Sequence, residues 1–249
     1  MCGRFAVTTD PALLATRIDA VNEVPQAADT GPNYNVAPTD AVLTVVGRRP
    51  DFGDESTRLL TLMRWGFIPP WATAGSDGAP LAGGPLLINA RAEKLTTTPA
   101  YRGSAERRRC LVPMDGYYEW RAGPETAPRA RKTPFYIHGD GTTLFAAGVW
   151  SSWRRDRRSA AVCSVAIITT AAVGELAEIH HRMPLLLPEN RWESWLDPGA
   201  GIDTAVLSEA PDVTGIAVRE VSTLVNSVRN NSPELIAAAA PRPEQGYLL

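Results

Sequence analysis

Cysteine and histidine are scarce in this 249-residue chain, which has three of each. The cysteines are Cys2, Cys110 and Cys163; no CxxC pair is present, and two of the histidines are adjacent. This pattern argues against a structural zinc site and against a disulfide framework. We therefore expect no bound metal, and in a reducing cytoplasm Cys2 is expected to be a free thiol.

Long hydrophobic runs are also missing. No stretch approaches the roughly 20 apolar residues that a membrane-spanning helix needs, and no apolar core of a secretory signal is visible near the N-terminus. No GxGxxG or Walker-type loop is present, so a nucleotide cofactor is unsupported. The sequence predicts a cytoplasmic protein with no cofactor and no membrane partner.

Charge of neither sign dominates the chain. The formal net charge is -2 and the isoelectric point is about 6.0, with 21% charged and 44% hydrophobic residues. These are ordinary values for a folded globular protein. A globally basic nucleic-acid binder is not indicated, although a local basic groove is compatible with this sum.

Short apolar stretches separated by Gly, Pro or charged turns predict many short strands and few helices. Strands are expected at 41–46, 59–65, 110–113, 116–121, 134–138, 144–150, 161–170 and 213–221, and helices at 11–21, in parts of 92–105, at 171–179 and at 189–196. Residues 23–38 and the Gly/Ala-rich stretch after Trp71 are expected to be loops. Without a βαβ alternation, this order favours an α+β fold with a mainly antiparallel, barrel-like sheet flanked by short helices. We expect one domain over residues 1–240 and a C-terminal tail at 241–249.

The most distinctive residue is Cys2, in MCGRFAV. If Met1 is removed, the α-amine and the thiol of Cys2 share one Cα atom, and this 1,2-aminothiol differs chemically from an internal cysteine. The alternative is that a cysteine stands second by chance. Cys110 and Cys163 lie in apolar strand patterns and are expected to be buried and inert.

Two further segments carry candidate proton-transfer groups. Glu119 stands among aromatic residues in YYEW; facing solvent it is ordinary, whereas facing inward it becomes a candidate acid or base. His180 and His181, in EIHHRMP, are the main source of a proton carrier near neutral pH. The alternative for the histidine pair is a polar helix terminus.

Two more segments suit contacts to nucleic acid. In LINARAEKL, Asn89 and Arg91 share one side of an extended segment and suit phosphate or carbonyl recognition, unless they are a turn Asn and a solvated Arg. In MRWGFIPPW, Trp65 suits core packing. Trp71 follows two prolines and precedes a loop, so it is expected to be exposed and able to stack on a base.

These segments occur together in one order over residues 2–236, namely MCGRF, NYNVAPT, MRWGFIPPW, INARAEK, RRCLVPMDGYYEW, IITTAA, EIHHRMP and VSTLVNSVRNNSPELI. In this the sequence resembles the SRAP family, the SOS response-associated peptidase or abasic site processing proteins. The resemblance implies a protein of the DNA-damage response that senses abasic sites in single-stranded DNA and cross-links to them covalently. It also implies the older family label of thiol autopeptidase, a hydrolase that removes the residues ahead of the cysteine.

The implied chemistry agrees with a cysteine at position 2. An abasic deoxyribose opens to an aldehyde, the amine of Cys2 adds to it with loss of water, and the thiol closes a five-membered thiazolidine. Because both nucleophiles sit on one Cα, ring closure benefits from a high effective molarity. An α-amine titrates near pH 7.7–8.0, so a useful fraction is neutral.

The resemblance assigns roles to ten residues by matched motif. The catalytic set is Cys2, Asn89, Glu119 and His180; the DNA-binding set is Arg4, Pro70, Trp71, Arg91, Thr169 and Arg229. In this assignment Glu119 exchanges protons with the Cys2 amine and the sugar, His180 assists ring opening and its reversal, and Asn89 positions Cys2. The arginines hold flanking phosphates, which carry no sequence information. His181 receives no catalytic role.

Two other functions are weighed against covalent capture. A cysteine peptidase would use Cys2 with His180 and Glu119 as a Cys-His-carboxylate triad, although an N-terminal nucleophile suits self-processing better than turnover of foreign peptides. A non-covalent binder of single-stranded DNA would leave Cys2 incidental. Covalent capture ranks first, with association with the nucleoid expected when DNA is damaged.

Overall fold

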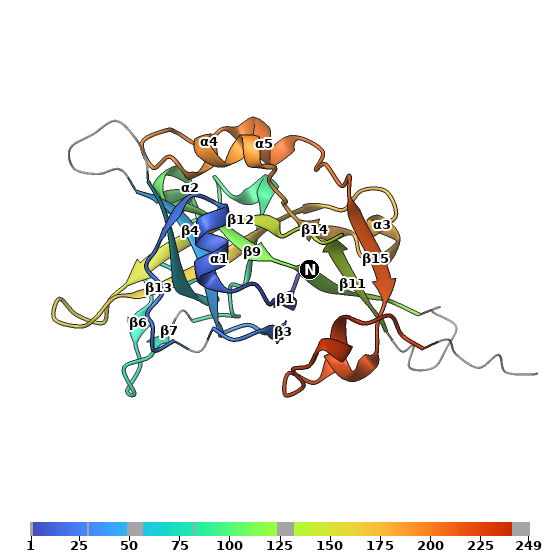
Figure 1. Cartoon of the computed structure of the whole chain (residues 1–249). Coiled ribbons are helices and arrows are strands. Elements are labelled where there is room, and N and C mark those ends of the chain that lie inside the picture. Colours follow the sequence, from blue (N-terminus) through green and yellow to red (C-terminus); the bar gives the residue numbers. More distant parts are fainter. Residues whose placement is uncertain (1, 29, 49–56, 82, 124–131, 241–249) are drawn as a thin grey trace, which may run out of the picture.

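A computed structural model of the chain describes residues 2–28, 30–48, 57–81, 83–123 and 132–240 (Figure 1). The strands in these ranges are β1 (Phe5–Val7), β2 (Ala20–Asn22), β3 (Asn33–Val36), β4 (Ala41–Arg48), β5 (Thr57–Trp65), β6 (Thr73–Ala74), β7 (Pro80–Leu81), β8 (Asn89–Arg91), β9 (Arg109–Met114), β10 (Gly116–Arg121), β11 (Thr133–Gly139), β12 (Leu144–Trp153), β13 (Val162–Ala171), β14 (Arg182–Pro184) and β15 (Ile216–Glu220). The α-helices are α1 (Pro11–Arg17), α2 (Arg102–Arg107), α3 (Leu176–Ile179), α4 (Trp192–Leu196) and α5 (Thr204–Ser208), and the 3₁₀ turns are η1 (Ala92–Lys94), η2 (Glu189–Arg191), η3 (Thr223–Asn226) and η4 (Pro233–Ile236).

Five strands close into a ring in the larger sheet. Its antiparallel pairs run β5–β4–β9–β12–β13, and β13 then pairs with β5 in parallel, which completes the circle. A second sheet has the order β15-β11-β10-β1-β3 and is antiparallel throughout. The expected α+β fold with a mainly antiparallel, barrel-like sheet and short flanking helices is confirmed.

Strands of the ring are buried on both faces, which explains why they read as continuous apolar runs. In β9, Leu111 packs with residues of α1 and α4 in one core, whereas Cys110 and Val112 pack in a second core. That second core also contains Tyr117 and Ile137 of the smaller sheet. The smaller sheet therefore closes one side of the ring, and the candidate site residues of β10 lie at this junction.

Helix α1 begins as expected, with Asp10 as N-cap and Pro11 as the first helical residue. The Asp10 carboxylate accepts hydrogen bonds from two backbone N–H groups of the first turn, at 2.8 and 3.1 Å. The predicted extent of 11–21 is too long, because Asp19 adopts a left-handed conformation (φ 50°) and the chain continues as β2. Strand β2 therefore occupies the positions where the predicted helix would have ended.

Other differences from the sequence prediction are confined to short elements. Residues 23–38, expected to be a loop, contain β3, and the stretch after Trp71 folds into the small β6–β7 pair. The helix predicted at 171–179 shortens to α3, because β13 extends to Ala171. Strand β14 and helix α5 were not anticipated. The predicted tail at 241–249 lies outside the described residues.

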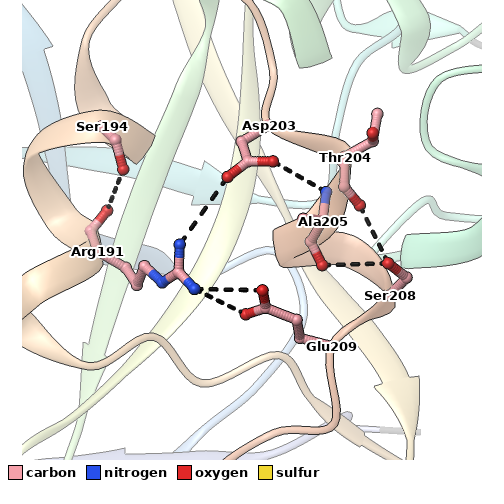
Figure 2. Close-up of polar contacts among 7 residues, drawn as sticks. All are labelled: Arg191, Ser194, Asp203, Thr204, Ala205, Ser208 and Glu209. Atoms are coloured by element: carbon pink, nitrogen blue, oxygen red, sulfur yellow. Dashed lines mark hydrogen bonds and ion pairs between the residues drawn. The ribbon is translucent and has the colours of Figure 1, made fainter.

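An arginine fastens α5 to the turn before α4 (Figure 2). Arg191 donates to Glu209 at 2.9 Å and lies 3.9 Å from the Asp203 carboxylate, while Asp203 also accepts from the backbone N–H of Ala205 as the N-cap of α5. In Figure 1 these two helices lie together on one side of the molecule, away from the N-terminal end of β1. They contribute to the core and carry none of the candidate site residues.

Candidate active site

The backbone around Cys2 is held as an extension of the β1–β10 pair. Phe5 lies opposite Tyr117, and the Tyr118 N–H donates to the Arg4 carbonyl at 2.9 Å, one step further toward the N-terminus. The Cys2 side chain is fully buried within the second core. Cys2 is therefore enclosed by the fold and is not a loose end of the chain.

Asn89 reaches Cys2 from a different sheet. Strand β8 pairs in parallel with β13, with Asn89 opposite Ile167, and this pairing fixes the Asn89 backbone. The hydroxyl of Tyr101 donates to the Asn89 carbonyl at 3.0 Å. The Asn89 side-chain Nδ2 then donates to the carbonyl oxygen of Cys2 at 2.8 Å. The structure thus places the Asn89 amide against Cys2, and the positioning role of Asn89 stays a prediction.

Glu119 faces inward, which resolves the alternative that the sequence left open. It shares a face of β10 with Tyr117, since alternate strand residues point to the same side. Its side chain is only 4% exposed. The carboxylate oxygen Oε1 lies 4.0 Å from Nδ1 of His180. Glu119 and His180, which are 61 residues apart in the chain, are thus brought together at the β10–α3 contact.

The backbone of Arg182 holds the His180 ring. The Arg182 N–H lies 3.0 Å from Nδ1 and the Arg182 carbonyl oxygen lies 3.2 Å from the same atom. A neutral Nδ1 accepts from the N–H, and a protonated Nδ1 donates to the carbonyl. The same residue can therefore satisfy either protonation state, as suits a group that gains and loses a proton.

Burial raises the pKa of the Cys2 thiol well above its ordinary value, and the Glu119 carboxylate raises this pKa further. The thiol is consequently protonated at neutral pH. The exposed neighbour His181 stacks on His180 with ring centroids 4.3 Å apart, and the positive charge of a protonated His180 lowers the pKa of His181. A second charge on His181 is therefore disfavoured when His180 is protonated.

Glu93 and Arg182 form a pair that the sequence reasoning did not assign, although both stand in motifs it singled out. Arg182 donates to the two Glu93 oxygens at 2.7 and 3.0 Å and also donates to the Thr169 carbonyl. Thr169, expected to line the DNA-binding pocket, is fully buried here. Arg182 thus connects β14 to η1 and β13 through hydrogen bonds. These contacts also fix the position of the segment that carries His180.

Arg4 points toward the C-terminal turns. Its guanidinium donates to Asn35 Oδ1 at 2.8 Å and to the Val225 carbonyl at 2.9 Å, and burial lowers the pKa of Arg4. The buried Asn35 side chain also donates to the carbonyls of Ser227 and Asn230. Sequence reasoning missed Asn35, because the carbonyls that its side chain contacts lie about 190 residues away in the chain.

The remaining predicted DNA contacts lie at the surface. Arg91, Arg229 and Pro70 are exposed, and 54% of Trp71 is exposed, whereas Trp65 is fully buried as expected. Trp71 borders a shallow apolar pocket whose other lining residues include Leu87 and Pro99. Leu87 lies two residues before Asn89, so this pocket is close in sequence to the catalytic candidates. The DNA-binding role of these residues stays a prediction.

The other two cysteines differ in exposure. Cys110 is fully buried, as expected, but Cys163 near the start of β13 is only half-buried. Among the described residues, no group of three or more His, Cys, Asp and Glu side chains is arranged to hold a metal ion. The part of the chain that the structure describes contains no helix long and apolar enough to cross a membrane.

Comparison with solved structures supports the fold. A protein of Bacteroides thetaiotaomicron matches with a TM-score of 0.76 and 22% identity, covering 96% of this chain and all of that one. A phage-related protein of Bordetella bronchiseptica matches with a TM-score of 0.63 and 29% identity over 88% of this chain and 94% of its own.

Sequence comparison identifies the family. The chain is 34% identical to the abasic site processing protein YoqW of Bacillus subtilis, over 95% of this chain and 99% of that protein. It is 29% identical to the abasic site processing protein HMCES of Gallus gallus, over 95% of this chain and 77% of that protein. The family model described as SOS response associated peptidase (SRAP) matches residues 1–228. The chain therefore belongs to the SRAP family.

Proposed function

We propose that this protein processes abasic sites in DNA by capturing them covalently through Cys2, after removal of Met1. The observation that carries the proposal is the convergence on Cys2 of an amide that holds its carbonyl and of a buried carboxylate paired with a histidine. The names of the relatives support DNA containing abasic sites as the partner. We propose single-stranded DNA as its form and residues 1–240 as one functional domain.

The proposed reaction condenses one aldehyde with one aminothiol and releases one water. The neutral amine of Cys2 forms a bond to C1 of the opened sugar while the carbonyl π pair moves to oxygen, which takes up a proton, and the nitrogen then releases one of its own protons. The resulting hydroxyl leaves as water with a second proton, giving the protonated imine. The Cys2 sulfur then bonds to C1, the C=N π pair returns to nitrogen, and the thiol proton departs.

Glu119 and His180 are the proton carriers in this scheme. His180, 23% exposed, delivers a proton to the ring oxygen of the sugar to open it, and the reverse transfer closes it. Glu119, deeper in the site, takes the proton of the amine or the thiol. Asn89 fixes the Cys2 carbonyl so that amine and thiol keep one orientation. The same groups can run the reaction backward, in which one water is consumed and the cross-link is hydrolysed to release the opened sugar.

Contacts outside the site hold the DNA. Arg91 and Arg229 are exposed cations placed to neutralise flanking phosphates, and their contribution should weaken with salt. Trp71 and Pro70 offer an exposed apolar edge for a neighbouring base. Arg4 joins this set if a phosphate displaces one of its two protein acceptors.

A thiol peptidase is the second candidate, and the thiol environment argues against turnover of foreign peptides. Cysteine peptidases lower the pKa of their nucleophile with an adjacent cation, whereas burial and Glu119 raise the pKa of Cys2 here. Self-removal of the residue ahead of Cys2 needs only one event and is compatible with the site. A non-covalent binder of single-stranded DNA remains the third candidate.

The test uses intact-mass analysis of purified protein alone and after incubation with a single-stranded oligonucleotide that holds one abasic site. We expect loss of Met1 in the first sample and a denaturation-stable adduct in the second, with none on the intact oligonucleotide. Cys2→Ala should abolish the adduct. Cys110→Ala is the matched control, since this cysteine is also buried, and should retain it. An equal yield of stable adduct from Cys2→Ala would overturn the proposal.

A further inference from the structure

Tyr117 is a buried residue beside Cys2 whose hydroxyl has no assigned task. The side chain is fully buried and packs in the same core cluster as Cys2. Its hydroxyl makes no hydrogen bond to any described residue. A buried hydroxyl without a partner destabilises the fold, so its presence calls for a reason beyond packing.

The adjacent tyrosine shows what an ordinary buried hydroxyl does in this strand. Tyr118 is as deeply buried, on the opposite face of β10, and its hydroxyl donates to the Tyr34 carbonyl at 2.7 Å. Tyr117 instead faces the side on which Glu119 lies. Its phenol is close enough to both reactive groups that Cys2 and Glu119 add to the effect of burial in raising its pKa. The phenol therefore keeps its proton and acts as a donor, never as a base.

We infer that the Tyr117 hydroxyl donates a hydrogen bond to the Cys2 sulfur during ring closure, and so speeds conversion of the open imine to the thiazolidine. This inference rests on the proposed function. In the step, the thiol proton passes to the Glu119 carboxylate, the sulfur lone pair forms the bond to C1, and the C=N π pair moves to nitrogen. Tyr117 keeps its own proton and stabilises the negative charge on sulfur before the bond forms.

The need for such a donor follows from the surroundings of the thiol. Burial disfavours the thiolate, and the titratable groups around it are Glu119, whose charge opposes a thiolate, and His180, which lies beyond that carboxylate. A neutral donor lowers the energy of the thiolate without adding a charge to the core. A hydrogen bond to a charged group of this kind changes a rate by about ten- to a hundredfold.

The variant Tyr117→Phe removes only the hydroxyl and keeps the ring. Met1-free protein is mixed with the abasic oligonucleotide and sampled with and without sodium borohydride, which traps the imine, whereas the thiazolidine survives denaturation without it. We expect Tyr117→Phe to form imine at the wild-type rate and to close the ring about ten- to a hundredfold more slowly. The pH at which closure accelerates should also shift upward, since the thiolate is less stabilised.

Tyr118→Phe is the matched control, and it should lose stability while closing the ring normally. Tyr117→Phe should be at least as stable as the wild type, because an unpaired buried hydroxyl is removed. Equal closure rates in Tyr117→Phe and wild type would overturn the inference. So would a loss of stability in Tyr117→Phe matching that of Tyr118→Phe, because the hydroxyl would then have a structural partner.

A second arm separates this inference from the proposed function. Formaldehyde also forms a thiazolidine with an N-terminal cysteine and needs no DNA binding. Mass analysis monitors the loss of the free Cys2 thiol, and this loss reports ring closure on the small aldehyde. If wild-type protein forms no DNA adduct but Tyr117→Phe still slows closure on formaldehyde, the proposed function fails and the role of Tyr117 stands. If both proteins close on formaldehyde equally fast, the role of Tyr117 fails.

Discussion

The Asn89 side chain donates a 2.8 Å hydrogen bond to the Cys2 carbonyl and so joins β8 to the residues ahead of β1. The two residues lie 87 positions apart, and the bond fixes the carbonyl on the same Cα that carries the thiol. The other polar atom of the Asn89 side chain, Oδ1, is buried and makes no hydrogen bond to a described residue. The amide thus orients Cys2 and also places an acceptor beside it.

Replacing Asn89 should therefore impair capture more than folding. We expect Asn89→Ala to lower the unfolding free energy by about 1 kcal/mol, as for one lost hydrogen bond, and to slow adduct formation by about tenfold or more, because Cys2 loses its orientation. Thermal unfolding and adduct formation on the abasic oligonucleotide measure the two effects. Wild-type adduct rates in a folded Asn89→Ala protein would contradict the positioning role.

Glu119→Gln tests the buried proton carrier. The substitution keeps the volume and removes the group that takes up protons, so adduct formation should slow by about 10²–10⁴-fold. The control is Glu178→Gln, since Glu178 is an exposed carboxylate in α3, close in sequence to His180. If both variants react at the wild-type rate, Glu119 carries no proton in the rate-limiting step.

Much of this arrangement follows from the sequence because it depends on local patterns. The apolar runs that form the ring strands, the Asp10–Pro11 helix start and the exposed Trp71 after two prolines each result from short-range rules. The motif order then names Cys2, Asn89, Glu119 and His180 as one set. What brings them together is the register of β8 on β13 and of β1 on β10, which joins segments far apart in the chain.

The residues that sequence reasoning missed are those whose role exists only in three dimensions. Asn35 and Arg182 are polar side chains with several partners each, all distant in sequence. Nothing in a local window separates them from solvated polar residues. Similarly, whether Glu119 faces inward depends on which face of β10 is covered, and the pairing of whole sheets decides this.

The Glu93–Arg182 pair makes a pH-dependent contribution to stability. Partial burial opposes ionisation of Glu93, but the hydrogen bonds and charge of Arg182 outweigh it and lower the Glu93 pKa below its ordinary value of 4.5. The stabilisation is therefore present above that ordinary pKa and is lost as the pH falls through the folded-state value. Because half of the Glu93 side chain is exposed, Glu93→Gln should cost no more than about 1 kcal/mol at pH 7.

The same variant should also disturb His180, since Arg182 carries the backbone groups that hold its ring. Denaturant unfolding at pH 7 and pH 3.5, with adduct formation at pH 7, measures both effects. We expect the stability gap between Glu93→Gln and wild type to narrow at the lower pH. A gap of equal size at both values would show that the charge of Glu93 does not contribute.

Trp71→Ala should weaken binding to single-stranded DNA without harming the fold. Trp71 is more than half exposed, so its removal should change stability by no more than about 0.5 kcal/mol. Stacking of a base on an aromatic side chain is worth about 1–3 kcal/mol, so the dissociation constant should rise by about five- to a hundredfold in fluorescence anisotropy. Trp71→Phe keeps an aromatic face and should retain much of the affinity. Equal affinity of Trp71→Ala and wild type would exclude stacking on this side chain.

His138 and Arg219 should make the smaller sheet sensitive to acid. Arg219 Nε donates to His138 Nε2 at 2.9 Å across the β11–β15 pair, so the imidazole must be neutral to accept. Burial lowers the His138 pKa, and the Arg219 charge lowers it further against the opposing effects of Gly139 and Asp140. The unfolded chain thus binds a proton at a higher pH than the folded chain, and stability falls as the pH drops below about 6.5.

His138→Gln supplies an acceptor that does not titrate, and it isolates this effect from the other two histidines. We expect the wild type to lose about 1 kcal/mol between pH 7 and pH 5 through the lost hydrogen bond, and the variant to lose less over the same range. Thermal unfolding at several pH values gives both curves. Parallel curves would show that His138 does not gain a proton in this pH range, or that its hydrogen bond with Arg219 does not contribute to stability. A fall of the wild-type curve relative to the variant curve toward low pH would place the acid-sensitive contact at the junction of β11 and β15.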